Sequence, residues 1–105
     1  MYIGRFAPTP SGPLHFGSVV AALASYLDAK HNNGLWKIRI DDIDSPRTKE
    51  GAELSILKRL ESLGLIWDGD ISRQSENIKE YNHNFEILNK RNLTYNCKCT
   101  RKKIA

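Results

Sequence analysis

The residues from Ala7 to Ser18, APTPSGPLHFGS, constrain the fold more than any other part of this sequence. Their three prolines fix φ and remove N–H donors, so a regular helix or strand is disfavoured until the last proline has passed. Their two glycines, Gly12 and Gly17, let a flat or anionic ligand come close to the backbone. We therefore expect a stiff loop that joins a strand to a helix beside a bound ligand.

The segments around this loop predict a parallel α/β unit. Residues 2–7 suit a buried first strand, residues 16–31 have helical periodicity that ends at Asn32-Asn33-Gly34, and residues 36–40 alternate as a second strand does. Strand, helix and strand in this order give a right-handed βαβ unit, with the loop at the carboxyl end of the first strand. The apolar positions at helical spacing in residues 16–31 are Val19, Val20, Leu23 and Leu27.

Two more helices are predicted after a polar turn at residues 41–47. One covers about residues 52–63 and ends at Gly64, and the other is capped by Ser75 and ends at Asn92. Residues 65–67 read as a short apolar segment closed by a turn at Asp68-Gly69, and residues 93–95 read as an extended stretch. The apolar faces are Ile56, Leu57, Leu60 and Leu63 in the former helix, and Ile78, Tyr81, Phe85 and Leu88 in the latter.

Composition bounds the class of protein without identifying it. The chain has 105 residues, 40% of them hydrophobic, which suits at most one domain with a modest core. Its longest nearly apolar segment, residues 19–27, is too short to span a bilayer, and residues 1–6 lack the basic-then-apolar order of a signal peptide. We expect a soluble, cytoplasmic protein without a membrane partner. The net charge of +4 is compatible with an anionic partner, and the basic residues Lys98, Arg101, Lys102 and Lys103 read as a solvated tail.

The two cysteines, Cys97 and Cys99, flank a single lysine. Residues two apart rarely meet disulfide geometry, so the pair reads as two thiolate ligands or as two unrelated thiols. Zinc normally takes four ligands, and residues 100–105 contain no Cys, His, Asp or Glu. The sequence therefore holds at most half of a zinc site.

The residues from His15 to Ser18 fall at the start of the predicted helix. Free N–H groups and the helix dipole favour a phosphate at this position. His15 would donate a hydrogen bond to charge that develops on a phosphate. The alternative is a stiff turn in which the histidine only caps the helix.

The string RFAPTPSGPLHFGS resembles the signature of class I aminoacyl-tRNA synthetases of the glutamyl type, and His15 to Ser18 matches their ATP-binding HIGH element. The resemblance continues through KIRIDDIDSPR and through RQSE at residues 73–76. GSVVAALASYLDA, IDDIDSPR, WDGD and the cysteine pair look more like the glutamyl-queuosine tRNA(Asp) synthetases of this family than like full glutamyl-tRNA synthetases.

This resemblance implies a Rossmann-type α/β catalytic domain, of which residues 1–96 would be the N-terminal part and residues 97–105 the start of a zinc-binding insertion. It implies that ATP, with Mg²⁺, activates glutamate to glutamyl-adenylate, and that the glutamyl group passes to queuosine in the anticodon of tRNA(Asp). A monomer is expected. The alternatives are the same region of a glutamyl-tRNA synthetase that charges tRNA(Glu), and a non-catalytic nucleotide- or tRNA-binding module. The second alternative is motivated by the absence of a KMSKS-like sequence, so the isolated chain is expected to be inactive.

The same resemblance assigns roles to individual residues. The glutamate-binding residues would be Arg5, Ala7, Thr9 and Asp41, with Arg5 on a carboxylate of the substrate and Asp41 on its α-amino group. The ATP-binding residues would be Pro8, Thr9, His15, Gly17 and Ser18, of which His15, Gly17 and Ser18 would be catalytic. The zinc ligands would be Cys97 and Cys99.

Two alternatives concern the acidic residues of this region. Arg5 and Asp41 could form a structural ion pair with each other instead of binding glutamate. The acids at Asp41, Asp42 and Asp44 could suggest a magnesium site, but helix capping and salt bridges, including one with Arg47, are the preferred interpretation. Asp44 and Arg47 are also possible contacts for the acceptor nucleotide. Asp41 is one methylene shorter than the glutamate usual in the family.

Overall fold

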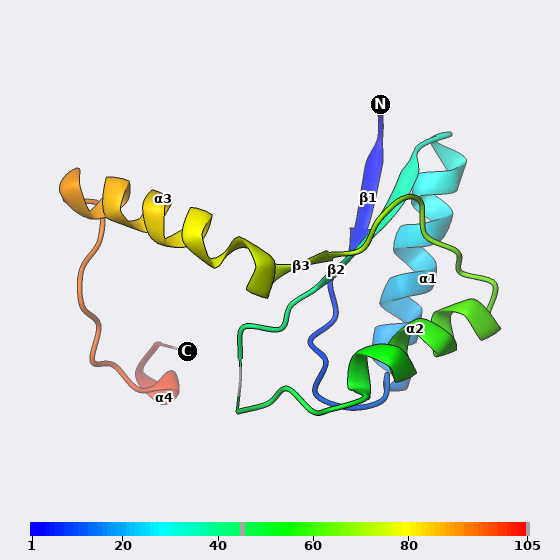
Figure 1. The fold of residues 1–105 in the computed structure, drawn as a ribbon, viewed down its shortest axis with the longest axis horizontal. Helices are drawn as coiled ribbons and strands as arrows, with labels where there is room; N and C mark the ends of the chain where they lie inside the picture. Colours follow the sequence, from blue (N-terminus) through cyan, green and yellow to red (C-terminus); the bar gives the residue numbers. More distant parts are fainter. Residues whose placement is uncertain (45, 105) are drawn as a thin grey trace.

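A computed structural model describes residues 1–44 and 46–104 of the chain. Its elements run in the order β1 (Ile3–Phe6), α1 (Phe16–His31), β2 (Leu35–Ile40), α2 (Ala52–Ser62), β3 (Ser72–Arg73), the 3-10 helix η1 (Gln74–Asn77), α3 (Ile78–Lys90) and α4 (Arg101–Ile104) (Figure 1). The three strands form one parallel sheet in the order β1-β2-β3. The predicted α/β class and βαβ unit are therefore confirmed. Within the described residues, no helix is long and apolar enough to cross a membrane.

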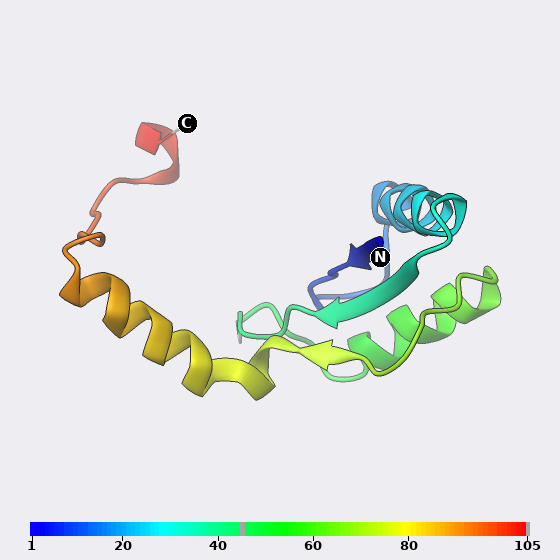
Figure 2. The ribbon, with the colours of Figure 1, turned by 90° about the horizontal axis from the view of Figure 1, so that it is seen from above.

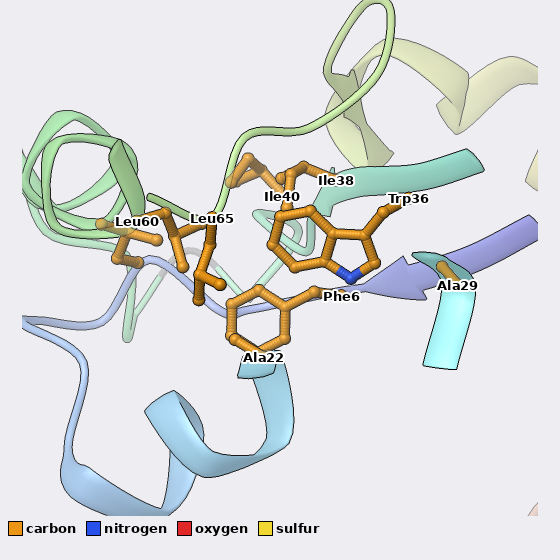
Figure 3. Close-up of a cluster of buried hydrophobic side chains, with 9 residues drawn as sticks. Phe6, Ala22, Ala29, Trp36, Ile38, Ile40, Leu60 and Leu65 are labelled. Atoms are coloured by element: carbon orange, nitrogen blue, oxygen red, sulfur yellow. The ribbon is translucent and has the colours of Figure 1, made fainter. Parts of the chain in front are cut away.

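The core lies on one face of the sheet, against α1 and α2. Side chains alternate along β2, and Trp36, Ile38 and Ile40 are its buried members. They form one cluster with Ala22 and Ala29 of α1 and with Ile56 and Leu60 of α2. Both helices therefore cover the same face of the sheet, as two successive right-handed crossovers in one direction require (Figures 1 and 3).

Trp36 is the centre of this core. Its indole ring stacks beside Phe6 at 6.3 Å between centroids and meets the ring of Tyr26 edge-on at 5.3 Å. The indole N–H donates to the Ser25 hydroxyl at 2.9 Å, so burial leaves no polar group of this side chain unpaired. Trp36 thus joins β1, α1 and β2 (Figure 3).

The face of α1 that packs on the sheet is made of small residues. A side chain on Gly4 of β1 would come within 3.1 Å of the Ala29 methyl group and 3.3 Å of the Ser25 carbonyl, so the helix and strand are in close contact. Ala22 and Ala29 are fully buried, whereas Val20, Leu23 and Leu27 of the predicted apolar face are 43–56% exposed. Helical spacing located the helix correctly, but bulky residues cannot occupy so narrow an interface.

The three long helices end in the same way. Asn33, Gly64 and Asn92 have left-handed φ values of 51°, 75° and 57°. In each case the next residue donates its N–H back into the last turn, as Gly34 does to Ala29 at 2.8 Å. These are the stop signals predicted from the sequence, and they place the helix ends within one or two residues of the expected positions.

Other predicted elements differ from the structure. β1 is buried only at alternate residues, because α1 and α2 cover one face of the sheet. Residues 65–67 and 93–95 have no regular secondary structure, and Leu65 of the predicted apolar segment packs in the core. The strand β3 and the short α4 were not predicted. Ser75 does not cap α3, since its hydroxyl donates to Asp42 and η1 precedes that helix.

α3 leaves the sheet and extends away from the core (Figure 2). Its predicted apolar face (Ile78, Tyr81, Phe85 and Leu88) is 40–58% exposed. Periodicity alone correctly predicted this helix, but the described residues supply no layer that covers it.

Gly34 should be intolerant of any side chain. A methyl group there would overlap the Tyr2 carbonyl, which accepts the adjacent Leu35 N–H at 3.0 Å in the pairing of β1 with β2. We expect Gly34→Ala to lower the free energy of unfolding by about 3 kcal/mol, measured by urea denaturation. Gly64→Ala is the control, since the site is open and only the left-handed φ costs about 1 kcal/mol. Equal losses would show that the Tyr2 contact is unimportant.

Candidate active site

The proline-rich loop after β1 is fixed to the loop that follows β2. The carbonyl of Pro8 accepts the Asp41 N–H at 3.0 Å, and that of Pro10 accepts the Lys49 N–H at 2.9 Å. Both prolines are buried. The carboxyl ends of β1 and β2 are thereby joined at one edge of the sheet, where α/β folds commonly bind their ligands.

This loop encloses a cleft of about 320 Å³ with the start of α1. Its lining includes five residues predicted to bind glutamate or ATP: Ala7, Pro8, Thr9, His15 and Ser18. A larger groove, of about 770 Å³, lies between Pro13, Leu14 and α2 and contains none of the predicted site residues. We take the smaller cleft as the candidate site because it is lined by residues predicted to bind glutamate or ATP.

His15 is the N-cap of α1 instead of a residue in its first turn. Its Nδ1 accepts the Ser18 N–H at 3.2 Å, and its Nε2 lies 3.0 Å from the Ser18 hydroxyl. Since Nδ1 accepts, the neutral ring carries its proton on Nε2. The alternative in which the histidine caps the helix is therefore confirmed. Among the described residues, the amides of Phe16 and Gly17 in the first turn of α1 have no hydrogen-bond acceptor.

Gly17 does not line the cleft, but it sets the position of the histidine. A side chain at Gly17 would lie 3.1 Å from Cε1 and 3.2 Å from Nδ1 of His15. Those contacts are tighter than ordinary packing, so a larger residue would push the imidazole out of its capping position. The spacing of His15, Gly17 and Ser18 therefore has a local physical reason.

Asp41 pairs with Arg39, not with Arg5. The guanidinium of Arg39 donates from Nε to Oδ1 at 2.6 Å and from Nη2 to Oδ2 at 3.1 Å. This bidentate hydrogen bonding raises the pKa of Arg39 above its usual value. The expected alternative of an Arg5–Asp41 bridge is wrong. Arg5 is exposed on β1 and forms no salt bridge within residues 1–44 and 46–104.

Sequence reasoning missed Arg39, although a signal was present. Residues two apart on a strand face the same side, so Arg39 and Asp41 at the end of β2 were placed to meet. It also missed Arg73, whose Nε donates to Glu53 of α2 at 2.6 Å and whose Nη1 lies 3.5 Å from Glu76. Arg73 fixes β3 to α2 and η1, which no local pattern indicates.

The acids after Asp41 each have a separate protein partner. Both oxygens of Asp42 accept from Ser75, at 2.8 Å from the amide and 2.6 Å from the hydroxyl. Burial raises the pKa of Asp42, but the hydrogen bonds from Ser75 outweigh it and the pKa lies below its usual value. Asp44 pairs with Arg47 at 3.4 Å. The salt-bridge interpretation is confirmed for Asp44 and Arg47, whereas α2 has no side-chain cap; Asp42 instead holds Ser75 in η1.

Cys97 and Cys99 are free and exposed. In the part of the chain that the structure describes, no group of three or more His, Cys, Asp or Glu residues could hold a metal ion. Two thiols supply half of the usual zinc ligand set. Zinc binding, like the division of the chain at residue 97, stays a prediction.

A parallel βαβ unit with a cleft at the carboxyl end of its first strand is the arrangement in which many α/β domains bind their ligands. Residues 3–105 match the family model described as tRNA synthetases class I (E and Q), catalytic domain. The chain belongs to this family.

The chain is similar to curated relatives named glutamyl-Q tRNA(Asp) synthetase. It is 56% identical to the protein of Bordetella bronchiseptica over 99% of this chain and 33% of the relative, and 52% identical to that of Klebsiella pneumoniae over 98% and 35%. A crystal structure of a glutamate tRNA ligase from Elizabethkingia meningosepticum, in complex with its amino acid, matches 97% of this chain and 22% of its own with a TM-score of 0.81 and 36% identity. The chain spans about a third of the length of the curated relatives.

The cap formed by His15 can be separated from any chemical role. We expect His15→Ala to lower the free energy of unfolding by about 1 kcal/mol, because the Ser18 N–H loses its acceptor. His15→Asn should restore most of that stability, since asparagine is a strong N-cap residue. Urea denaturation of both variants measures the difference. A His15→Ala variant as stable as the unmodified chain would show that the ring does not cap α1.

Proposed function

We propose that this chain forms part of an enzyme that activates glutamate with ATP and transfers the glutamyl group to queuosine in tRNA(Asp). The observation that carries the proposal is the cleft beside Ala7, Thr9, His15 and Ser18, at the carboxyl end of β1. It is supported by 50–56% identity to glutamyl-Q tRNA(Asp) synthetases over nearly the whole chain.

The ATP phosphates would lie at the N-terminus of α1. The amides of Phe16 and Gly17 point their donors out of the helix end, where the dipole favours an anion. The Nε2–H of His15 lies 3.0 Å from the Ser18 hydroxyl, and with ATP bound it would donate to a phosphate oxygen instead. These donors suit charge that builds up on the α-phosphate during adenylyl transfer. The wall of the cleft formed by Pro8 and Thr9 would position the nucleotide.

Glutamate would lie between Arg5 and Asp41. The guanidinium of Arg5 is exposed and suits a substrate carboxylate, while Ala7 leaves room and Thr9 offers a hydroxyl. The carboxylate of Asp41 would accept from the substrate ammonium. Arg39 already occupies one site on each Asp41 oxygen, which fixes the carboxylate and leaves its remaining lone pairs for the ligand.

The proposed reaction has two steps. A carboxylate oxygen of glutamate attacks the α-phosphorus of ATP, the bond to the β-phosphate oxygen breaks, and pyrophosphate leaves. A hydroxyl of queuosine then attacks the mixed anhydride, AMP leaves with the bonding electrons, and the hydroxyl proton is released. Magnesium would accompany ATP and neutralise phosphate charge.

Several further features belong to the same proposal. Asp44 and Arg47 would contact the acceptor nucleotide, and Cys97 and Cys99 would supply two thiolates to a zinc ion. The enzyme would act as a cytoplasmic monomer. Transfer to tRNA(Glu) is the second candidate function, because a glutamate tRNA ligase shares this fold with a TM-score of 0.81.

Two assays test the proposed function. Glutamate-dependent pyrophosphate exchange should be robust in the full-length protein and weak in the 105-residue chain, which lacks a KMSKS-like lysine for the leaving phosphates. Transfer of labelled glutamate should then occur to queuosine-containing tRNA(Asp) and not to tRNA(Glu). Pyrophosphate exchange that does not depend on glutamate would contradict the proposed activation step. Charging of tRNA(Glu) alone would contradict the proposal that tRNA(Asp) is the acceptor.

Substitution of Arg5 tests the glutamate site. We expect Arg5→Ala in the full-length protein to raise KM for glutamate about 100-fold while leaving KM for ATP nearly unchanged, because only glutamate loses a charged partner. Arg5→Lys should recover part of the loss, since lysine keeps the charge without the bidentate geometry. Steady-state pyrophosphate exchange measures both constants. An equal rise in the two KM values would remove Arg5 from the glutamate site.

A further inference from the structure

The contact between β2 and β3 continues beyond the ends of the two strands. Their last backbone pair joins Ile40 to Arg73. Two residues further along each segment, the Oδ1 of Asp42 accepts the Ser75 N–H at 2.8 Å, and its Oδ2 accepts the Ser75 hydroxyl at 2.6 Å. A carboxylate side chain thus extends the pairing of the sheet in the same register, past the point where the backbone ladder stops.

This Asp42–Ser75 contact lies next to the residue proposed to bind the ammonium group of glutamate. The N–H of Asp41 donates to the Pro8 carbonyl at 3.0 Å, which ties Asp41 to the wall of the cleft. Residues 41–44 have no regular secondary structure that would fix their course. Because the peptide unit between residues 41 and 42 is planar, holding residue 42 against Ser75 also limits the positions that Asp41 can take.

Ser75 is presented by a segment that is itself fixed. Arg73, at the start of this segment, donates from Nε to Glu53 of α2 at 2.6 Å, and its Nη1 lies 3.5 Å from Glu76 of η1. The side-chain amide of Asn77 donates to the Arg73 carbonyl at 3.1 Å. The beginning of η1 is therefore anchored to α2, and Ser75 meets the loop after β2 as a donor with a set position.

We propose that Asp42 and Ser75 are positioning residues for glutamate, which hold the loop after β2 so that the Asp41 carboxylate stands where the substrate ammonium is bound. Neither residue is among those that line the cleft, so both act through Asp41. The inference rests on the proposed function for its substrate. The ATP side of the cleft is built by the loop after β1 and the start of α1, and the effect of Asp42 and Ser75 is therefore confined to glutamate.

Steady-state pyrophosphate exchange by the full-length protein gives the first test. Ser75→Ala should raise KM for glutamate about five-fold and leave kcat and KM for ATP nearly unchanged, because one of the two hydrogen bonds to Asp42 is lost. Asp42→Ala loses both and should raise it about ten-fold. The double variant should be no worse than Asp42→Ala alone, since the two residues act through one contact.

Two further variants separate positioning from a general loss of stability. Ser75→Thr keeps the hydroxyl and should behave like the unmodified protein. Ser62→Ala removes a serine hydroxyl that donates to the Arg59 carbonyl at 2.7 Å on α2, and it should leave both KM values unchanged. Additive effects in the double variant, or an equal rise of KM for glutamate and for ATP in Ser75→Ala, would overturn the positioning role.

Amide hydrogen exchange, measured by NMR without substrates, gives a second test that does not depend on the reaction. In Asp42→Ala the Asp41 amide should exchange about ten-fold faster, while the amide of Ile38 in the middle of β2 keeps its rate because the sheet stays folded. Unchanged exchange at Asp41, or an equal acceleration at Ile38, would overturn the inference. Faster exchange at Asp41 alone, in a protein without glutamate-dependent pyrophosphate exchange, would refute the proposed function and support the positioning of Asp41.

Discussion

The burial of Trp36 is the interaction on which the rest of the structure depends. Its ring contacts β1 through Phe6 and α1 through Tyr26, and its N–H is satisfied by Ser25. Its own backbone N–H donates to Asp68 at 2.8 Å, which lowers the pKa of that carboxyl and ties the segment before β3 to the start of β2. One residue thus holds the strands and the first helix in the arrangement from which the loops project.

The candidate site follows from that arrangement. Because β1 and β2 are parallel, their carboxyl ends lie at the same edge, and the loops after them meet through the Pro8–Asp41 backbone hydrogen bond. The prolines keep the first loop from continuing as a strand, while His15 begins the helix. The positions proposed for ATP and glutamate are therefore adjacent for topological reasons, and Arg39 and Ser75 hold the acids of the second loop in place.

Local patterns predicted most of the elements and many of the residues that line the cleft. The helix over residues 16–31 begins and ends as expected, because its cap and its stop signal are local in sequence. Local sequence patterns failed where packing depends on residues that are far apart in the sequence. The burial of Ala22 and Ala29 in place of Leu23 and Leu27 depends on how closely Gly4 lets β1 approach, which periodicity does not encode.

The sequence by itself determined the class of the fold, the loop and the residues that resemble a synthetase site, since these depend on backbone restrictions and side-chain chemistry over short stretches. Only the tertiary structure decided that Asp41 pairs with Arg39 and that Asp42 holds Ser75. A charged or aromatic side chain can pair with any of several residues within its reach. Which partner is close depends on the path of the whole backbone.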